Sequence, residues 1–278
     1  MEKILLCSDL DRTILPNGPQ PSSAGAVALL HRLHQIPEFM LAYVSGRNKT
    51  LITQAIKEYG IPVPDFAIGD VGTTIYEPRR DWRPWKDWTT EIASDWNHKP
   101  RLFLEQLLTD IHELELQEES NQNSLKLSYY TATNSDMTVL LDAIRSRLDG
   151  AGIKAAIIHS IDEEKDLGLV DILPQRATKV HAIRFLIKKT GIDESRTVFA
   201  GDSGNDLPAL TSGLNAVLVK NASKDIRERA LHHLAEKGWT NRLYTARGDF
   251  LGMNGNYCAG VLEGLAYFLP EIVELLKT

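Results

Sequence analysis

Apolar runs alternate with amphipathic segments in the first part of the chain. Residues 3–9 form a short apolar run that ends in carboxylates, and residues 39–47 form a second run that ends in Ser-Gly-Arg. Apolar positions recur at helical spacing after each run, and Ser22 or Ser23 is the expected N-cap of the first helix. Strand, helix, strand, helix in this order predicts a parallel sheet with right-handed crossovers.

The pattern changes near residue 82. An aromatic-rich stretch leads into segments with alternating helical and strand patterns, at 104–111, 125–131, 137–148, 154–161 and 167–173. From residue 174 the alternation of helices and parallel strands resumes. The sequence therefore predicts an α/β fold with a Rossmann-like parallel-sheet core, residues 1–81 and 174–278, and an inserted α+β cap domain, residues 82–173.

The composition of the chain indicates its cellular compartment and the classes of partner that it can bind. The chain has 278 residues, a net charge of −6 and two cysteines far apart in sequence, Cys7 and Cys258. These exclude a disulfide framework and favour a reducing, cytoplasmic setting. The first apolar run is too short for a signal peptide, and no run approaches the roughly 20 apolar residues that span a bilayer. No basic cluster supports a nucleic-acid partner, so we expect neither nucleic acid nor membrane as partners.

Four groups of polar residues stand where strands of the α/β pattern end. Ligands of open α/β sheets bind at the carboxyl ends of the strands, so these groups are expected to converge on one site. The groups are Asp9, Asp11 and Thr13; Ser45, Gly46 and Arg47; Lys179; and Asp202, Asn205 and Asp206.

These residue types suit phosphoryl transfer to a carboxylate. Two anions meet in such a reaction, so it needs a divalent metal and donors that hold the phosphoryl oxygens. Asp9 is the predicted nucleophile, and Asp11, on the same side of an extended backbone, is the predicted acid and base. The expected Mg²⁺ ligands are hard oxygens, those of Asp9, Asp11, Asp202 and Asp206. The expected phosphate ligands are Thr13, Ser45, Gly46, Arg47, Lys179 and Asn205.

The same residues carry a resemblance to a known superfamily. The segments 9–13 (DLDRT), 44–47 (VSGR), Lys179 and 201–206 (GDSGND) resemble, in order, the four motifs of haloacid dehalogenase phosphotransferases. The segments 70–76, 126–130, 171–179 and 254–268 are similar to sucrose-phosphate phosphatases. Two positions depart from the broader pattern, because Arg12 and Val180 stand where glycine is common.

The resemblance implies a Mg²⁺-dependent phosphatase that forms an aspartyl phosphate and hydrolyses sucrose 6-phosphate to sucrose and phosphate. Another phosphorylated sugar or glycoside, such as a mannosyl- or glucosyl-glycerate phosphate, remains open as the substrate. A phosphomutase uses the same nucleophile chemistry and also remains open. A non-catalytic regulatory partner of a glycosyltransferase is less favoured, because Asp9, Asp11, Lys179 and Asp202 are intact. Association with a sugar-phosphate synthase is a further hypothesis.

Two features of the insertion bear on the sugar. Lys126, Ser128 and Tyr130 share one face of the strand at 125–131, which is either a substrate surface or a plain solvent-facing sheet. Four tryptophans cluster at the start of the insertion and form either a sugar-stacking face or the packing of a domain junction, with packing favoured. They are Trp82, Trp85, Trp88 and Trp96.

Overall fold

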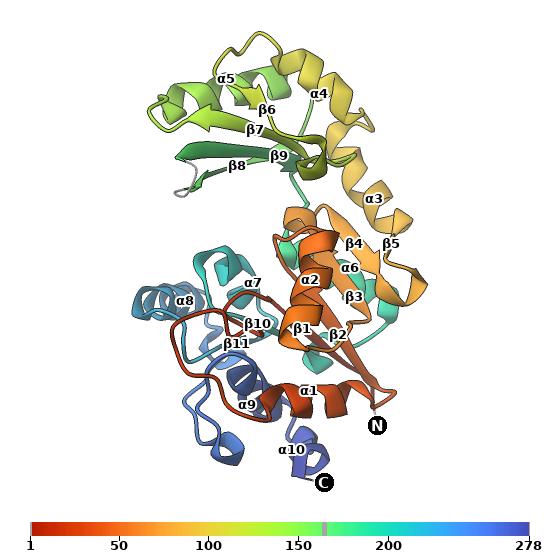
Figure 1. Cartoon of the computed structure of the whole chain (residues 1–278), viewed down its shortest axis with the longest axis vertical. Helices are drawn as coiled ribbons and strands as arrows, with labels where there is room; N and C mark the ends of the chain where they lie inside the picture. The colour runs from red at the N-terminus through yellow and green to blue at the C-terminus, as the bar shows by residue number, and fades with distance from the viewer. Residues whose placement is uncertain (1, 163–165, 278) are drawn as a thin grey trace. The chain divides into compact units, whose positions relative to one another are not determined.

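A computed structural model describes residues 2–162 and 166–277, and the chain divides into two compact units (Figure 1). The core unit contains Met1–Pro84 and Lys179–Thr278, and the cap unit contains Trp85–Thr178. The sequence pattern predicted both boundaries slightly earlier in the chain, at residues 82 and 174. The later position of the second boundary follows from contacts of Arg176 within the cap unit.

The core unit is built on an eight-stranded sheet with the order β12-β11-β10-β1-β2-β3-β4-β5. Its parallel strands are β1 (Ile4–Ser8), β2 (Phe39–Val44), β3 (Phe66–Gly69), β10 (Thr197–Gly201), β11 (Asn215–Leu218) and β12 (Leu243–Thr245). The antiparallel edge consists of β4 (Thr74–Glu77) and β5 (Arg83–Pro84). The predicted parallel α/β core is confirmed, whereas the pattern did not predict the edge strands.

Helices connect and cover these strands. They are α1 (Ala26–His34), α2 (Lys49–Tyr59), α6 (Lys179–Thr190), α7 (Leu207–Leu210), α8 (Lys224–Glu236), α9 (Cys258–Phe268) and α10 (Glu271–Lys277). Gly25, in the left-handed region, is the N-cap of α1, so the prediction of Ser22 or Ser23 is wrong. Asn48 caps α2 through its side chain, which accepts a hydrogen bond from the Leu51 N–H. In the described ranges, no helix is long and apolar enough to span a bilayer.

Helix α9 lies at the centre of the main apolar core. It contacts α1 and strands β10, β11 and β12, and its first nine residues are all buried. Gly264 permits this close approach, because a Cβ there would lie 2.3 Å from the Val217 side chain on β11. Cys7 and Cys258 are buried free thiols within the same unit.

The cap unit contains a four-stranded antiparallel sheet with the order β6-β7-β9-β8, in agreement with the predicted antiparallel sheet. Its strands are β6 (Glu115–Leu116), β7 (Leu127–Ala132), β8 (Ala155–Asp162) and β9 (Leu167–Pro174). Its helices are α3 (Lys86–Ala93), α4 (Arg101–Leu108) and α5 (Met137–Gly150). Helix α4 contacts both α5 and β7.

Arg176 keeps the returning chain within the cap unit. Its Nε donates to Asp95 Oδ1 at 2.9 Å, and its backbone N–H donates to Asp95 Oδ2 at 2.7 Å. Its Nη1 donates to Glu91 Oε1 at 3.1 Å. Asp95 is buried, so this pairing is screened less than an exposed one. The cap unit therefore extends past β9 to Thr178, and Lys179 is the first residue of the returning core.

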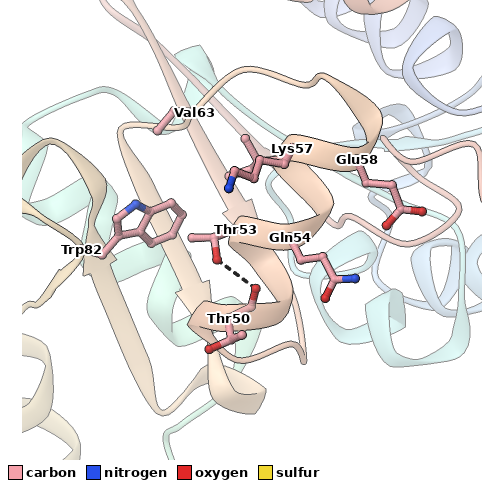
Figure 2. A pocket seen from close by; sticks show the side chains of 8 residues that line it. Thr50, Thr53, Gln54, Lys57, Glu58, Val63 and Trp82 are labelled. Atoms are coloured by element: carbon pink, nitrogen blue, oxygen red, sulfur yellow. Dashed lines mark hydrogen bonds between the residues drawn. The ribbon is translucent and has the colours of Figure 1, made fainter.

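The clustered tryptophans take different positions. Trp88 and Trp96 are fully buried, so the favoured packing role is confirmed for these two. Trp82 belongs to the core unit and lines a groove of about 730 Å³ with helix α2, where Thr53 and Lys57 face it (Figure 2). This groove is lined by α2, Val63 and Trp82, so it is separate from the four groups of polar residues.

The α9–β11 contact gives a stability prediction. Gly264→Ala should lower the free energy of unfolding by about 1–3 kcal/mol, because the added methyl group overpacks against Val217. Gly150→Ala is the matched control: Gly150 is also helical, but a Cβ there meets nothing within 4 Å. Thermal unfolding followed by circular dichroism compares the two. An unchanged Tm in Gly264→Ala would show that the helix can move away from the strand.

Candidate active site

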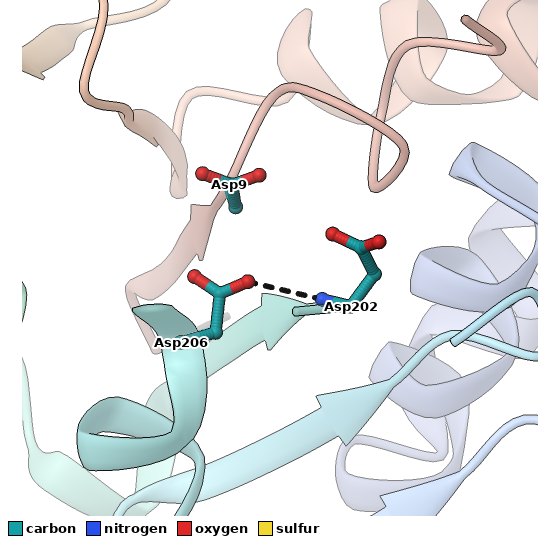
Figure 3. A group of neighbouring side chains, drawn as sticks. All are labelled: Asp9, Asp202 and Asp206. Atoms are coloured by element: carbon teal, nitrogen blue, oxygen red, sulfur yellow. Dashed lines mark hydrogen bonds between the residues drawn. The ribbon is translucent and has the colours of Figure 1, made fainter. Parts of the chain in front are cut away.

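Three buried carboxylates meet at the carboxyl ends of two neighbouring strands (Figure 3). Asp9 follows β1, Asp202 follows β10, and Asp206 lies in the short turn after β10. Because β1 and β10 pair in parallel, their carboxyl ends lie at the same edge of the sheet. One oxygen from each carboxylate lies within 4.8 Å of the others. The predicted convergence of the first and fourth groups is therefore present.

Lys179 joins two of these carboxylates. Its Nζ donates to Asp9 Oδ1 and to Asp206 Oδ1, each at 2.7 Å. Burial raises the pKa of Asp9 to about 7, although Lys179 opposes that shift. Burial also raises the pKa of Asp202 to about 6, and the Asp206 charge adds to the effect. Burial alone would lower the pKa of Lys179, but its two carboxylate partners outweigh it and raise the pKa.

Asp206 holds the turn that follows β10. Its Oδ2 accepts hydrogen bonds from the backbone N–H groups of Asp202 and Ser203 and from the Ser203 hydroxyl, each at 3.1 Å. Gly201 makes room for this carboxylate, because a Cβ there would lie 2.7 Å from the Asp206 side chain. Asp206 therefore shapes the site as well as contributing charge to it.

Thr13 and Arg12 both face Asp202. The Thr13 hydroxyl, fully buried, donates to Asp202 Oδ1 at 3.2 Å, although the sequence predicted it as a phosphate ligand. The Arg12 Nε lies 3.6 Å from Asp202 Oδ2. Arg12 has a φ of 56°, a conformation that favours glycine, which gives a reason for the glycine common at this position. This contact was not predicted from the sequence, although the arginine at position 12, where glycine is common, was a visible signal for it.

Arg47 pairs with Asp11. Its Nε and Nη2 donate to the two oxygens of Asp11, at 2.9 and 2.6 Å, and Asn17 Nδ2 donates to Oδ1 at 2.7 Å. Burial opposes ionisation of Asp11, but these hydrogen bonds outweigh it and hold its pKa below the usual value. The Asp11 carboxylate does not join the three others. Its carboxylate thus lies apart from the group that could hold a metal, and Asp11 as a metal ligand stays a prediction.

The remaining predicted phosphate ligands follow strands β2 and β10 of the same sheet. Ser45 directly follows β2 and is buried, and its hydroxyl oxygen accepts from the Arg47 N–H at 3.2 Å. Gly46 is exposed between them. Asn205 accepts from the Ser203 hydroxyl at 2.9 Å and lies 3.4 Å from Lys179 Nζ. Donors from β2, α6 and the turn after β10 thus belong to one unit of the fold.

The carboxylate group fits a small divalent cation. Its donor atoms are hard oxygens, the kind that Mg²⁺ binds. Their burial makes the ionised forms costly, as the raised pKa values of Asp9 and Asp202 indicate. A bound cation would offset that cost. Both oxygens of Asp206 already accept hydrogen bonds, Oδ1 from Lys179 and Oδ2 from the turn. Asp9 and Asp202 are therefore the stronger candidates for metal ligands.

The cap residues singled out in the sequence have partners within their own unit. Ser128 is fully buried and donates to Asp171 Oδ1 at 2.5 Å, so the prediction that it projects from the sheet to a ligand is wrong for this geometry. Lys126 Nζ lies 3.5 Å from the same carboxylate oxygen. The Tyr130 hydroxyl donates to Glu118 at 2.8 Å. Asp171, which lies on the neighbouring strand β9, was visible in the sequence only as part of the segment 171–179 and was not predicted as a site residue.

The parallel sheet, the carboxylates at the ends of adjacent strands, the lysine and the inserted antiparallel unit define a phosphatase of the haloacid dehalogenase superfamily. The particular family follows from the sequence as a whole. The family model of sucrose-6F-phosphate phosphohydrolases matches residues 2–269, and the chain belongs to this family.

Relatives and a solved structure agree with this placement. A HAD-like hydrolase of Nitrosococcus oceani is 54% identical over the whole chain, which covers 75% of that protein. The mannosylfructose-phosphate phosphatase of Agrobacterium fabrum is 28% identical over 80% of this chain and 85% of its own. The sucrose-phosphatase of Synechocystis, solved with sucrose and phosphate, matches with a TM-score of 0.69 and 28% identity, over 96% of this chain and 98% of that one. The chain spans about half the length of the plant sucrose-phosphatases it matches, such as that of tobacco at 28% identity.

Proposed function

We propose that this phosphatase is Mg²⁺-dependent, uses Asp9 as the nucleophile, and hydrolyses sucrose 6-phosphate to sucrose and phosphate. The observation that carries the mechanism is the position of Asp9, buried, paired with Lys179 and close to Asp202 and Asp206. A buried carboxylate whose charge is incompletely offset is a strong nucleophile for an electrophilic phosphorus atom. The enzyme is proposed to be cytoplasmic, in accord with its free thiols.

In the first step an Asp9 oxygen forms a bond to phosphorus, and the ester P–O bond breaks. The sugar leaves as an alkoxide, which Asp11 protonates. In the second step Asp11 takes a proton from water, and that oxygen attacks the phosphorus atom of the acyl phosphate. Inorganic phosphate leaves and the Asp9 carboxylate is restored. Asp11 is held as a carboxylate by Arg47, so the acid step requires Asp11 to take up a proton once substrate draws Arg47 away.

The transferred phosphoryl group is proposed to bind among donors from three elements. Lys179, the Ser45 hydroxyl and the Gly46 N–H contribute, and Asn205 contributes its amide. Thr13 is assigned instead to orient Asp202, because its hydroxyl already donates there. Asp9 and Asp202 would hold Mg²⁺, with Asp206 close by, and the bound ion would offset the negative charge of the phosphoryl oxygens.

Specificity for the sugar is assigned to the cap unit, because the core groups recognise only features common to all phosphate esters. Within the cap, Lys126 and Tyr130 are the proposed ligands of the sugar hydroxyls, and Ser128 orients Asp171 beside Lys126. Sucrose 6-phosphate is the preferred assignment, since the family and the Synechocystis relative point to it. A mannosylfructose phosphate is the second candidate, because of the Agrobacterium relative. Association with a sugar-phosphate synthase stays a hypothesis drawn from the sequence.

The substrate assignment is tested by phosphate release across a panel of sugar phosphates. The panel contains sucrose 6-phosphate, mannosylfructose phosphate, mannosyl- and glucosyl-glycerate phosphates and simple hexose phosphates. We expect the highest kcat/KM for sucrose 6-phosphate. A higher value for any other compound replaces the assignment. Transfer of phosphate to a second sugar rather than to water would identify a phosphomutase.

Asp9→Asn should lower kcat by about 10³-fold or more, because the isosteric amide cannot form the acyl phosphate. The Asn oxygen still accepts from Lys179, so circular dichroism and the Tm should match those of the wild type. Trapping of radiolabelled phosphate on the protein after an acid quench should succeed for the wild type and fail for the variant. Turnover near the wild-type rate would refute the covalent route.

Activity should require Mg²⁺, disappear in chelator and fall when Ca²⁺ replaces Mg²⁺. Ca²⁺ takes more ligands at longer distances, so both Asp9 oxygens could bind it and the attacking oxygen would be misplaced. A second measurement does not depend on turnover: Mg²⁺ should raise the Tm of the wild type but not of Asp202→Asn. Full activity in chelator, or equal Mg²⁺-dependent shifts in both proteins, would contradict the metal site.

A further inference from the structure

The motif at 70–76 borders the turn Ser45–Gly46–Arg47, and the proposed reaction leaves it without a role. Two backbone hydrogen bonds link the turn to residues 68 and 70, at the end of β3 and the start of the motif. The Ser45 N–H donates to the Ile68 carbonyl at 2.8 Å, and the Asp70 N–H donates to the Arg47 carbonyl at 2.9 Å. The peptide groups on either side of the turn are thus fixed from one neighbouring segment. The N–H groups of Gly46 and Arg47 between them keep little freedom to reorient.

The backbone of Gly69 lies so close to the Arg47 carbonyl oxygen that a side chain would not fit between them. A Cβ at Gly69 would lie 2.8 Å from the Arg47 carbonyl oxygen, so only glycine fits without a shift. Gly69 is the last residue of β3, which pairs in parallel with β2. The turn at 45–47 therefore rests directly on the end of the neighbouring strand.

The segment that makes this contact is strained. Asp70 and Val71, two consecutive residues other than glycine, have φ values of 52° and 59°. The left-handed region is especially unfavourable for a β-branched residue such as Val71. Such conformations persist only where the surrounding structure enforces them, and they concentrate at functional sites.

Side chains of the same motif enforce this conformation. The Tyr76 hydroxyl donates to Asp70 Oδ2 at 2.5 Å, and the Thr73 hydroxyl donates to the Asp70 carbonyl at 2.8 Å. Tyr76 is buried on β4, so its hydroxyl is a fixed anchor. The turn Asp70–Gly72 also contacts helix α6, whose first residue is Lys179.

We propose that Asp70 and Tyr76 are positioning residues for the phosphate-binding turn: they hold the Arg47 carbonyl and so aim the Gly46 N–H and the Ser45 hydroxyl, which accepts from the Arg47 N–H, at the phosphoryl oxygens. The inference rests on the proposed function, in which this turn binds the transferred phosphoryl group. It assigns the role to a pair of side chains that touch neither the substrate nor the metal.

Tyr76→Phe tests the pair. Inorganic phosphate, with Mg²⁺ present, should inhibit the variant with a Ki about 5-fold higher than for the wild type, the size expected for losing one modest hydrogen bond. The kcat/KM should fall by the same factor for a sugar phosphate and for p-nitrophenyl phosphate, because both carry the same phosphoryl group. The kcat should change less than about 2-fold, the mark of lost uniform binding.

A matched control exists in the same unit. The Tyr244 hydroxyl donates to Glu263 at 2.8 Å, so Tyr244→Phe removes the same kind of bond elsewhere. It should leave the phosphate Ki unchanged. Asp70→Asn keeps an acceptor for Tyr76 and tolerates a positive φ, so it should behave nearly as the wild type. Gly69→Ala displaces the Arg47 carbonyl directly and should raise the Ki even if Tyr76→Phe folds poorly.

The possible results distinguish a failure of the positioning role from a failure of the proposed phosphate site. Ser45→Ala should raise the phosphate Ki, and Tyr76→Phe should add less in that background than alone, because both act on one turn. If Ser45→Ala raises the Ki while Tyr76→Phe and Gly69→Ala do not, the positioning role is wrong. If Ser45→Ala also leaves the Ki unchanged, the turn does not bind phosphate and the proposed site fails. A lowered Tm with an unchanged Ki would reduce the pair to a structural role.

Discussion

The site depends on one ammonium group placed between buried carboxylates. Asp9 and Asp206 are both buried. Two carboxylates at such a short distance, without a positive partner, would repel each other and would also lose their hydration. Lys179 Nζ lies 2.7 Å from an oxygen of each, which makes their ionised forms tolerable in the folded state. Without this contact, burial would favour neutral acids, and a protonated Asp9 is no nucleophile.

The chain places that ammonium through its topology. Lys179 is the first residue after the cap unit and the first residue of α6, and Arg176 holds the preceding segment to Asp95 within the cap. Asp9 lies before the insertion in sequence, whereas Asp206 follows Lys179 and comes after β10. A sheet in which β1 lies between β10 and β2 brings these distant segments to one edge. The insertion can therefore vary in sequence without disturbing the arrangement of these side chains, provided that both connections return to the same points of the core.

The sequence predicted this edge because three of the four groups follow strands that apolar runs mark, whereas Lys179 begins helix α6. It could not predict which side chains pair within the group. Thr13 and Arg12 follow Asp9 closely in sequence, yet both are directed at Asp202, which is reached only through the pairing of β1 with β10. The short strands β4, β5 and β12, at or next to the sheet edges, were missed for a related reason. They contain too few residues to show a period, and their positions are set by neighbours rather than by their own apolar pattern.

The hydrogen-bond partners that the sequence could not reveal also explain why the neighbouring carboxylates Asp9 and Asp11 differ in pKa. Asp9 and Asp11 are two residues apart, but burial raises the pKa of Asp9 to about 7, whereas Arg47 and Asn17 hold the pKa of Asp11 low. In the proposed mechanism, the group with the raised pKa is the nucleophile, which Lys179 has to keep ionised. The group with the lowered pKa is the proposed acid and base, so its acidity has to change when Arg47 finds another partner. A phosphoryl group bound at the turn of residues 45–47 would be such a partner, since it competes for the same guanidinium. On this argument, substrate binding itself would convert Asp11 from an ion-paired carboxylate into a group able to carry the proton of the leaving alkoxide.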